Sequence, residues 1–141
     1  MARGATRAID ELVRAGVRHT VREYAVHDPG GAAARAGQHP AWGEEAVAAL
    51  GVDPARVHKT LIASVDGRLA VAVVPVAAEL DLKALADALG GRKAVMAEPA
   101  EAERATGYVR GGISPLGQRR RLPTVIDAAA IDLERILVSA G

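Results

Sequence analysis

The residues best suited to chemistry lie in one glycine-rich stretch of the chain, Thr106–Gln118. Its adjacent glycines, Gly111 and Gly112, allow the backbone to approach a ligand closely and to present N–H groups to it. The Ser114-Pro115 pair that follows favours an extended or turn conformation. The stretch is therefore predicted to be a binding loop made mainly from backbone.

The N–H groups of this loop are candidates for an oxyanion hole. We expect Gly111 and Gly112 to point at an ester carbonyl where negative charge develops, with the N–H of Ile113 as a further donor. One such donor lowers a reaction barrier by ~3 kcal/mol. The alternative is that the two glycines only make a turn.

Three consecutive arginines, Arg119, Arg120 and Arg121, follow the loop. Guanidinium groups match the geometry of phosphate, and such contacts make nucleic-acid binding salt-dependent. Together with Arg110, these arginines are predicted to contact the phosphates of a nucleic acid. The alternative is a solvated run of charge, which is the more frequent meaning of such a run.

Other candidates are scattered along the chain. Lys59 precedes the apolar residues Leu61 and Ile62, so its ammonium is either solvated at a strand end, the usual case, or at the rim of an apolar pocket, which the nearby chemistry of the glycine loop favours. Trp42 is either an ordinary core or surface aromatic or a residue that stacks on a base, a contact that contributes ~1–3 kcal/mol in single-stranded nucleic-acid sites. Ser139 has no His or Asp near it in sequence and is interpreted as a pocket wall or hydrogen-bond donor, not as a nucleophile.

The composition excludes several classes of site. The chain of 141 residues has no cysteine, so disulfides, thiolate zinc sites and cysteine nucleophiles are absent. The four histidines, which lack metal-binding spacing, are interpreted as structural: His19, His27, His39 and His58. Asp127 is predicted to be a cap or turn residue. No metal and no cofactor are expected.

Length and charge indicate one soluble domain. Half of the residues are apolar but Phe is absent, so the core is predicted to consist of small aliphatic side chains. The net charge of +1 means that nucleic-acid binding would need a local basic patch. The chain shows no signal peptide and no apolar run long enough to span a bilayer. We therefore expect a cytoplasmic protein without a membrane partner.

The pattern of apolar and turn residues predicts a mixture of helices and strands. Asp66-Gly67 is a strong hairpin signal between two apolar strands, and the second of these is predicted to be covered on both faces. Helices are predicted over 5–15, 42–50, 82–89 and 99–106, and strands over 17–26, 59–65, 68–76, 93–96, 123–128 and 136–139. The expected fold is a single α/β domain with a partly antiparallel sheet.

Several short motifs, taken together, resemble one known family. They are Lys59-Thr60-Leu61, Pro75-Val76, Leu82-Lys83, Ala105-Thr106-Gly107-Tyr108, the Gly111–Gly117 loop and Leu122–Asp127. This set is similar to the YbaK family of Cys-tRNA(Pro) deacylases, which is related to the editing insertion domain of bacterial prolyl-tRNA synthetases. The resemblance runs from about His27 to the end of the chain.

The resemblance implies a mixed, mostly antiparallel and partly barrel-like sheet surrounded by helices. It implies a trans-acting enzyme that removes the wrong amino acid from the acceptor end of a mischarged tRNA, with prolyl-tRNA synthetase as a further candidate partner. Catalysis would fall to Lys59 and the Gly111-Gly112 backbone. Substrate binding would fall to a second set: Tyr24, Trp42, Ile113, Ser114 and Ser139.

No general base or protein nucleophile is evident in the sequence, so the substrate's own group is predicted to attack. A cysteine thiol has a pKa of ~8.5, and intramolecular attack gains greatly from fixed geometry. The alternatives are another mischarged tRNA, such as the alanyl or seryl form, attacked by a tRNA hydroxyl or water, and a non-catalytic module that binds tRNA, nucleotide or a partner protein. The oligomeric state is left open.

Three departures from the family pattern stand out. Tyr24 lies three residues before His27 instead of two, so that either a bulge restores its position or Ala25 replaces it. The loop over 30–41 is longer than usual. Because the sequence stops at Gly141, the strand and helix that end the family's fold are expected to be absent.

Overall fold

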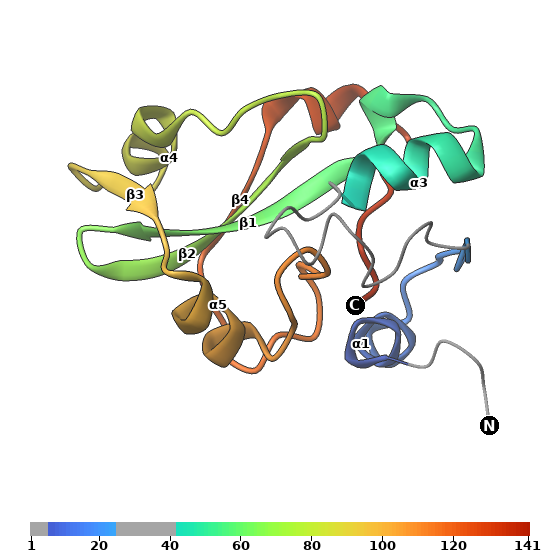
Figure 1. Cartoon of the computed structure of the whole chain (residues 1–141), viewed down its shortest axis with the longest axis horizontal. Coiled ribbons are helices and arrows are strands. Elements are labelled where there is room, and N and C mark those ends of the chain that lie inside the picture. Colours follow the sequence, from blue (N-terminus) through green and yellow to red (C-terminus); the bar gives the residue numbers. More distant parts are fainter. Residues whose placement is uncertain (1–5, 25–41) are drawn as a thin grey trace, which may run out of the picture.

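The structure is a computed structural model and describes residues 6–24 and 42–141, with the side chain of Trp42 outside that description. Figure 1 shows helices arranged around a central sheet. The helices are α1 (Arg7–Ala15), α3 (Trp42–Leu50), α4 (Leu82–Ala88) and α5 (Pro99–Thr106), with short 3-10 turns η1 (Pro54–Arg56) and η2 (Ala128–Asp132). The strands are β1 (His58–Val65), β2 (Arg68–Pro75), β3 (Ala94–Met96) and β4 (Thr124–Ile126).

The sheet has the order β3-β1-β2-β4. Its central pair, β1 and β2, is antiparallel, and β3 adds antiparallel to β1. The outer strand β4 runs parallel to β2. The described part of the chain therefore confirms the predicted mixed, mostly antiparallel sheet in an α/β domain.

The hairpin between β1 and β2 is the one that the sequence predicts. Asp66 and Gly67 form its two-residue turn and both have positive φ, at 50° and 85°. The Asp66 carboxylate accepts hydrogen bonds from the backbone N–H groups of Arg92, at 2.9 Å, and Lys93, at 3.0 Å. The turn thus also holds the segment that enters β3.

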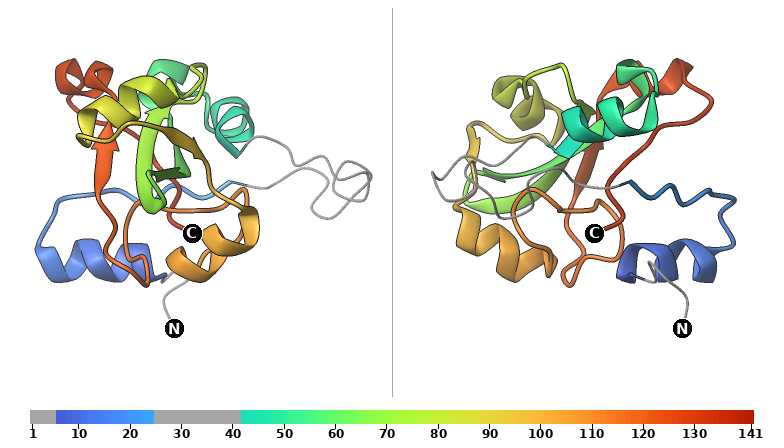
Figure 2. Two further views of the ribbon diagram at one scale, coloured as in Figure 1. Left: turned by 90° about the vertical axis from the view of Figure 1, so that its left-hand side faces the viewer. Right: turned by 45° about the vertical axis from the view of Figure 1, so that its right-hand side comes forward.

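Two apolar clusters lie on opposite faces of the sheet. One contains Ala63 and Val65 of β1 packed with Leu85 and Ala86 of α4. The other contains Ile62 of β1 with residues of β2 and α5, and Ile113 and Val138 pack against it. Figure 2 shows α4 and α5 on either side of the strands. Strand β2 is consequently buried on both faces, as predicted.

The helix ends follow the capping signals in the sequence. The Thr6 hydroxyl accepts from the Ile9 N–H at the start of α1, and Gly16 ends that helix in the left-handed conformation. Asp81 caps α4 through the Ala84 N–H. Asp127 caps η2 by accepting from the Ala129 N–H at 2.8 Å, which confirms its predicted role as a cap.

Two predicted strands are wrong or reduced. Residues 17–24 have no regular secondary structure, and Val17 and Val21 are largely exposed, because no neighbouring strand pairs with this segment. Residues 25 and 26 of that prediction lie outside the described part, as do His27, His39 and the loop over 30–41. The strand predicted over 136–139 is a single parallel bridge between Val57 and Leu137.

None of the helices formed by residues 6–24 and 42–141 combines the length and the apolar character that spanning a bilayer requires.

Asp66 should make the stability of the folded protein depend on pH in the acidic range. Its hydrogen bonds to the Arg92 and Lys93 N–H groups lower its pKa from the ordinary value of about 3.9. Its contribution is therefore present above pH ~4 and is lost as the pH falls through the lowered pKa. We expect Asp66→Asn to lower the free energy of unfolding at pH 7, measured by urea titration, and the deficit to shrink toward pH 3. A deficit that is equal at both pH values would contradict this assignment.

Candidate functional site

The glycine-rich segment forms a loop that leaves α5 and returns to it. Gly107 ends the helix in the left-handed conformation, with a φ of 81°, and its N–H donates to the Glu103 carbonyl at 2.8 Å. The chain comes back where the N–H groups of Arg119 and Arg120 donate to the carbonyls of Thr106 and Ala105, each at 3.0 Å. The loop over 107–118 is thus closed at its base by backbone hydrogen bonds.

Polar side chains fix the interior of this loop. Ser114 is fully buried, and its hydroxyl accepts from the Leu116 N–H at 3.2 Å. The Tyr108 hydroxyl donates to the Leu116 carbonyl at 2.6 Å, and the Gln118 amide donates to the Ser114 carbonyl at 2.9 Å. Burial raises the pKa of Tyr108, and the nearby Arg7 guanidinium opposes that rise. The loop has a defined conformation before any ligand binds.

The glycine pair makes a tight turn at the tip. Gly111 has a φ of 86°, a conformation that suits glycine, and the Gly112 N–H donates to the Val109 carbonyl at 2.9 Å. The Gly112 N–H, predicted as an oxyanion donor, is therefore engaged within the turn. The N–H groups of Gly111 and Ile113 donate to no acceptor among the residues that the structure describes. Of the three N–H groups predicted as oxyanion donors, these two are the ones left for a ligand.

Ser139 joins the end of the chain to this turn. Its side chain is buried, and its hydroxyl donates to the Gly112 carbonyl at 3.3 Å and accepts from the Gly141 N–H at 3.1 Å. Gly141 in turn lies against the Tyr108 ring, where an added Cβ would be 2.4 Å from a ring carbon. The Ser139 hydroxyl thus supports the loop, and both of its hydrogen-bonding roles are occupied.

Lys59 lies on the strand that borders this segment. The bridge between Val57 and Leu137 is parallel, and it lies two residues before Lys59 on one segment and two residues before Ser139 on the other. Lys59 is half-buried. Because side chains alternate along β1, the Lys59 side chain leaves the strand on the α4 face of the sheet, as the Ala63 side chain does. Ile113 packs on the other face. No hydrogen bond between described residues joins the Lys59 ammonium to the loop.

Two polar atoms on β1 have no partner in the described structure. His58 is fully buried; its Nδ1 lies 3.3 Å from the Arg56 carbonyl, whereas its Nε2 has no hydrogen bond. The buried Thr60 hydroxyl also has none. Alternation places both side chains on the same face as Ile62, which is the face of the glycine loop. Sequence reasoning gave His58 a structural role and did not single out the Thr60 hydroxyl, because nothing in a local pattern reveals a missing partner.

The arginines that are predicted to contact phosphate all lie on the surface. Arg110 and Arg119 to Arg121 are exposed, and the backbone N–H of Arg110 donates to the Glu103 carboxylate at 2.8 Å. The guanidinium groups of Arg7 and Arg119 both approach Gly107, each within 3.1 Å of the position that a Cβ there would take. A basic group from α1 therefore joins the predicted arginines beside the base of the loop.

Tyr24 and Trp42 are not brought to the loop by any described contact. Tyr24 is half-buried, and burial, assisted by the Glu45 carboxylate of α3, raises its pKa. Trp42 is the first residue of α3, and its predicted stacking lies outside the described side chains. The structure thus associates Tyr24 with α3.

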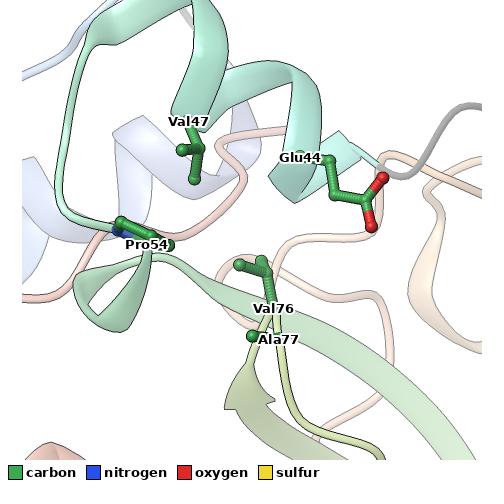
Figure 3. A pocket seen from close by; sticks show the side chains of 5 residues that line it. All are labelled: Glu44, Val47, Pro54, Val76 and Ala77. Carbon is green, nitrogen blue, oxygen red and sulfur yellow. The ribbon is translucent and has the colours of Figure 1, made fainter.

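Surface depressions lie beside α3 and beside α1 in the described part of the molecule. One, of about 190 Å³, lies between α3 and the end of β2, where Val47 and Val76 point toward each other and Glu44 lies to one side (Figure 3). It is lined by Glu44, Val47, Pro54, Val76 and Ala77. A second, of about 220 Å³, lies between α1 and the loop. Neither is lined by Lys59, Gly111, Gly112 or Ser139, and the described residues hold no cluster of metal-binding side chains.

Residues 40–141 match the family described as the aminoacyl-tRNA editing domain. The chain belongs to this family. It is 40% identical, over 109 residues and 72% of its length, to EbsC of Enterococcus faecalis (strain ATCC 700802 / V583), which is named as a candidate Cys-tRNA(Pro)/Cys-tRNA(Cys) deacylase. The match spans 66% of that relative, slightly less than two thirds of its length.

Solved structures show the same fold at low sequence identity. A chain from work on computational epitope grafting onto scaffold proteins has a TM-score of 0.78 at 20% identity, covering 100% of this chain and 82% of that one. The crystal structure of a candidate trans-editing enzyme for prolyl-tRNA synthetase has a TM-score of 0.70 at 24% identity, covering 90% and 73% of the two chains. These likenesses confirm the expected fold.

Removal of the Tyr108 hydroxyl should loosen the loop. Tyr108→Phe deletes the donor to the Leu116 carbonyl, and we expect a loss of about 1 kcal/mol in the free energy of unfolding. Tyr24→Phe is the matched control, since Tyr24 makes no hydrogen bond with a described residue. Urea titration of both variants measures the difference, and equal losses would show that the Tyr108 hydrogen bond does not stabilise the fold.

Removal of the Thr60 hydroxyl should have the opposite effect. Because Thr60→Val keeps the shape and deletes a buried group without a partner, we expect the free energy of unfolding to rise by about 1 kcal/mol. Thr124→Val is the control, since that exposed hydroxyl donates to the Leu122 carbonyl at 3.2 Å. A destabilised Thr60→Val protein in thermal denaturation would mean that the hydroxyl is paired in solution.

Proposed function

We propose that this protein is a trans-acting aminoacyl-tRNA deacylase that clears mischarged tRNA, with Cys-tRNA(Pro) as its substrate. Membership of the aminoacyl-tRNA editing family supports the reaction class. The name of the 40% identical relative, a candidate Cys-tRNA(Pro)/Cys-tRNA(Cys) deacylase, supports the choice of amino acid. The structural observation that carries the proposal is a fixed loop whose Gly111 and Ile113 N–H groups have no described acceptor.

The loop would act on the ester that joins the amino acid to the tRNA. The Gly111 and Ile113 N–H groups stabilise negative charge on the ester oxygen, as an oxyanion hole does. Gly112 contributes by holding the turn, since its N–H donates to Val109 and its carbonyl accepts from Ser139. The loop does not have to reorganise when charge develops, because these contacts already exist in the free protein.

The attacking group would come from the substrate. The cysteine thiolate attacks its own ester carbonyl carbon, the ester C–O bond breaks, and the ribose oxygen of the tRNA leaves as a hydroxyl after taking the proton that the thiol gave up. The amino acid leaves as a cyclic thioester. The engagement of the Ser139 hydroxyl by Gly112 and Gly141 supports this route over a serine nucleophile. Fixed geometry is the main contribution of the protein to such an attack.

The remaining site residues would bind the tRNA end. Lys59, two residues after the parallel bridge between Val57 and Leu137, is proposed to contact the terminal phosphate or the aminoacyl group. Tyr24, Trp42 and Ser114 would shape the pocket, with Ser114 acting through the loop that it holds. The exposed side chains of Arg110 and Arg119 to Arg121 would contact phosphates of the acceptor stem. Prolyl-tRNA synthetase is proposed as a transient partner that releases the substrate.

A deacylation time course with purified protein tests the proposal. Cys-tRNA(Pro) should be consumed and Ala-tRNA(Pro) spared, because only cysteine carries the thiol. We expect Lys59→Ala to lower kcat/KM by at least tenfold, the effect of losing about 1.4 kcal/mol of transition-state binding. Lys83→Ala, at an exposed lysine of α4, is the control and should be unaffected.

Each other outcome has a distinct meaning. Consumption of Ala-tRNA(Pro) alone would replace the thiol with a tRNA hydroxyl or water as the attacking group. Binding of tRNA without loss of either amino acid would show a non-catalytic binding module. Full activity of Lys59→Ala would remove Lys59 from the site while leaving the reaction in place.

A further inference from the structure

Helix α1 contacts the glycine loop although it precedes the part of the chain that matches the editing family. The match covers residues 40–141, whereas α1 spans Arg7–Ala15. Figures 1 and 2 show α1 beside the end of the chain and the returning arm of the loop. The proposed reaction therefore does not by itself explain why α1 lies against the loop.

The contact with the loop is made by one side chain and one close backbone approach. The Glu11 carboxylate accepts a hydrogen bond from the Gly117 N–H at 2.7 Å. Gly117 has a φ of 66°, and an added Cβ would lie 2.5 Å from the carbonyl carbon and oxygen of Arg7. Only glycine combines this conformation with this separation, so the two backbones are in direct contact.

The start of α1 also contacts the segment that carries Ser139. The Thr6 hydroxyl donates to the Ala140 carbonyl at 2.5 Å. Ala140 follows Ser139, whose hydroxyl donates to the Gly112 carbonyl. The start of α1 thus contacts both segments that the Ser139–Gly112 hydrogen bond joins, the loop at Gly117 and the Ser139 segment at Ala140.

Apolar packing alone does not account for this arrangement. The only buried residue of α1 is Ala8, and Glu11 itself is exposed. A helix that served mainly to extend the core would bury a stripe of large apolar side chains. Ile9 and Leu12 are only half-buried, so directed hydrogen bonds and a backbone contact supply much of the attachment of α1 and fix its orientation.

We propose that α1 is a positioning element for the glycine loop and that Glu11 is its positioning residue. Through Gly117, Glu11 sets the distance between the loop donors, Gly111 and Ile113, and the Ser139 segment. The effect on turnover rests on the proposed deacylase function, whereas the effect on the loop does not.

Amide hydrogen exchange, followed by NMR on the full chain, tests the contact without reference to activity. In Glu11→Ala the Gly117 amide should exchange about tenfold faster, as expected when a charge-assisted hydrogen bond is lost. Glu11→Gln keeps an acceptor oxygen and should retain most of the protection. Asp10→Ala is the control, because Asp10 is an exposed neighbour on α1 that has no hydrogen bond from the loop. Unchanged exchange in Glu11→Ala would overturn the proposal.

Kinetics with Cys-tRNA(Pro) then test the link to function. Glu11→Ala should lower kcat by several-fold with KM within about twofold, and Glu11→Gln should restore most of kcat. Faster Gly117 exchange with an unchanged kcat would overturn the positioning role. If the wild-type protein deacylates no substrate, the proposed function fails, and the exchange data still decide whether Glu11 holds the loop.

Gly117→Ala provides a second variant at the same contact. Its Cβ would separate the loop from Arg7, so protection of the neighbouring loop amides should fall further than in Glu11→Ala. Circular dichroism confirms that the remaining helices are folded. A Gly117→Ala protein with wild-type loop exchange would overturn the inference independently of Glu11.

Discussion

The antiparallel pairing of β1 and β2 is the interaction on which the other elements depend. Strand β3 pairs with β1, β4 pairs with β2, and the two apolar clusters occupy the two faces of the pair. The side chains are mostly Ala, Val and Leu, so close spacing of the elements replaces the bulk that aromatic residues would supply. The α5 helix, which the glycine loop extends, is positioned by this packing.

Local signals predicted most of this architecture, because each acts within a few residues. Asp66-Gly67 accepts positive φ and makes the hairpin, and Gly107 ends α5 for the same reason. The segment over 17–24 failed as a strand since a strand requires a partner, which its own residues do not specify. Likewise, the 136–139 segment pairs only at Leu137.

The sequence predicted the separate segments of the candidate site but not the hydrogen bonds that join them. The glycine loop was evident from composition, whereas the engagement of the Gly112 N–H follows from a turn geometry that composition does not fix. The hydrogen bond from Ser139 to Gly112 joins residues far apart in sequence, and so does the bond from Gly117 to Glu11. Such contacts depend on how the chain returns past the sheet, and no spacing rule reports them.

The contacts of α1 also constrain the order in which the protein is assembled. Its partners, Gly117 and Ala140, lie 106 and 134 residues after the residues of the α1 region that they contact, so they leave the ribosome well after the helix. A nine-residue helix is only marginally stable in water without tertiary contacts. This segment therefore fluctuates between helix and coil while the rest of the chain is synthesised. Four of its nine residues are charged, and these favour solvation of the segment in that interval. Helix α1 is thus an element that remains solvated, without its partners in the loop, until the rest of the domain has folded.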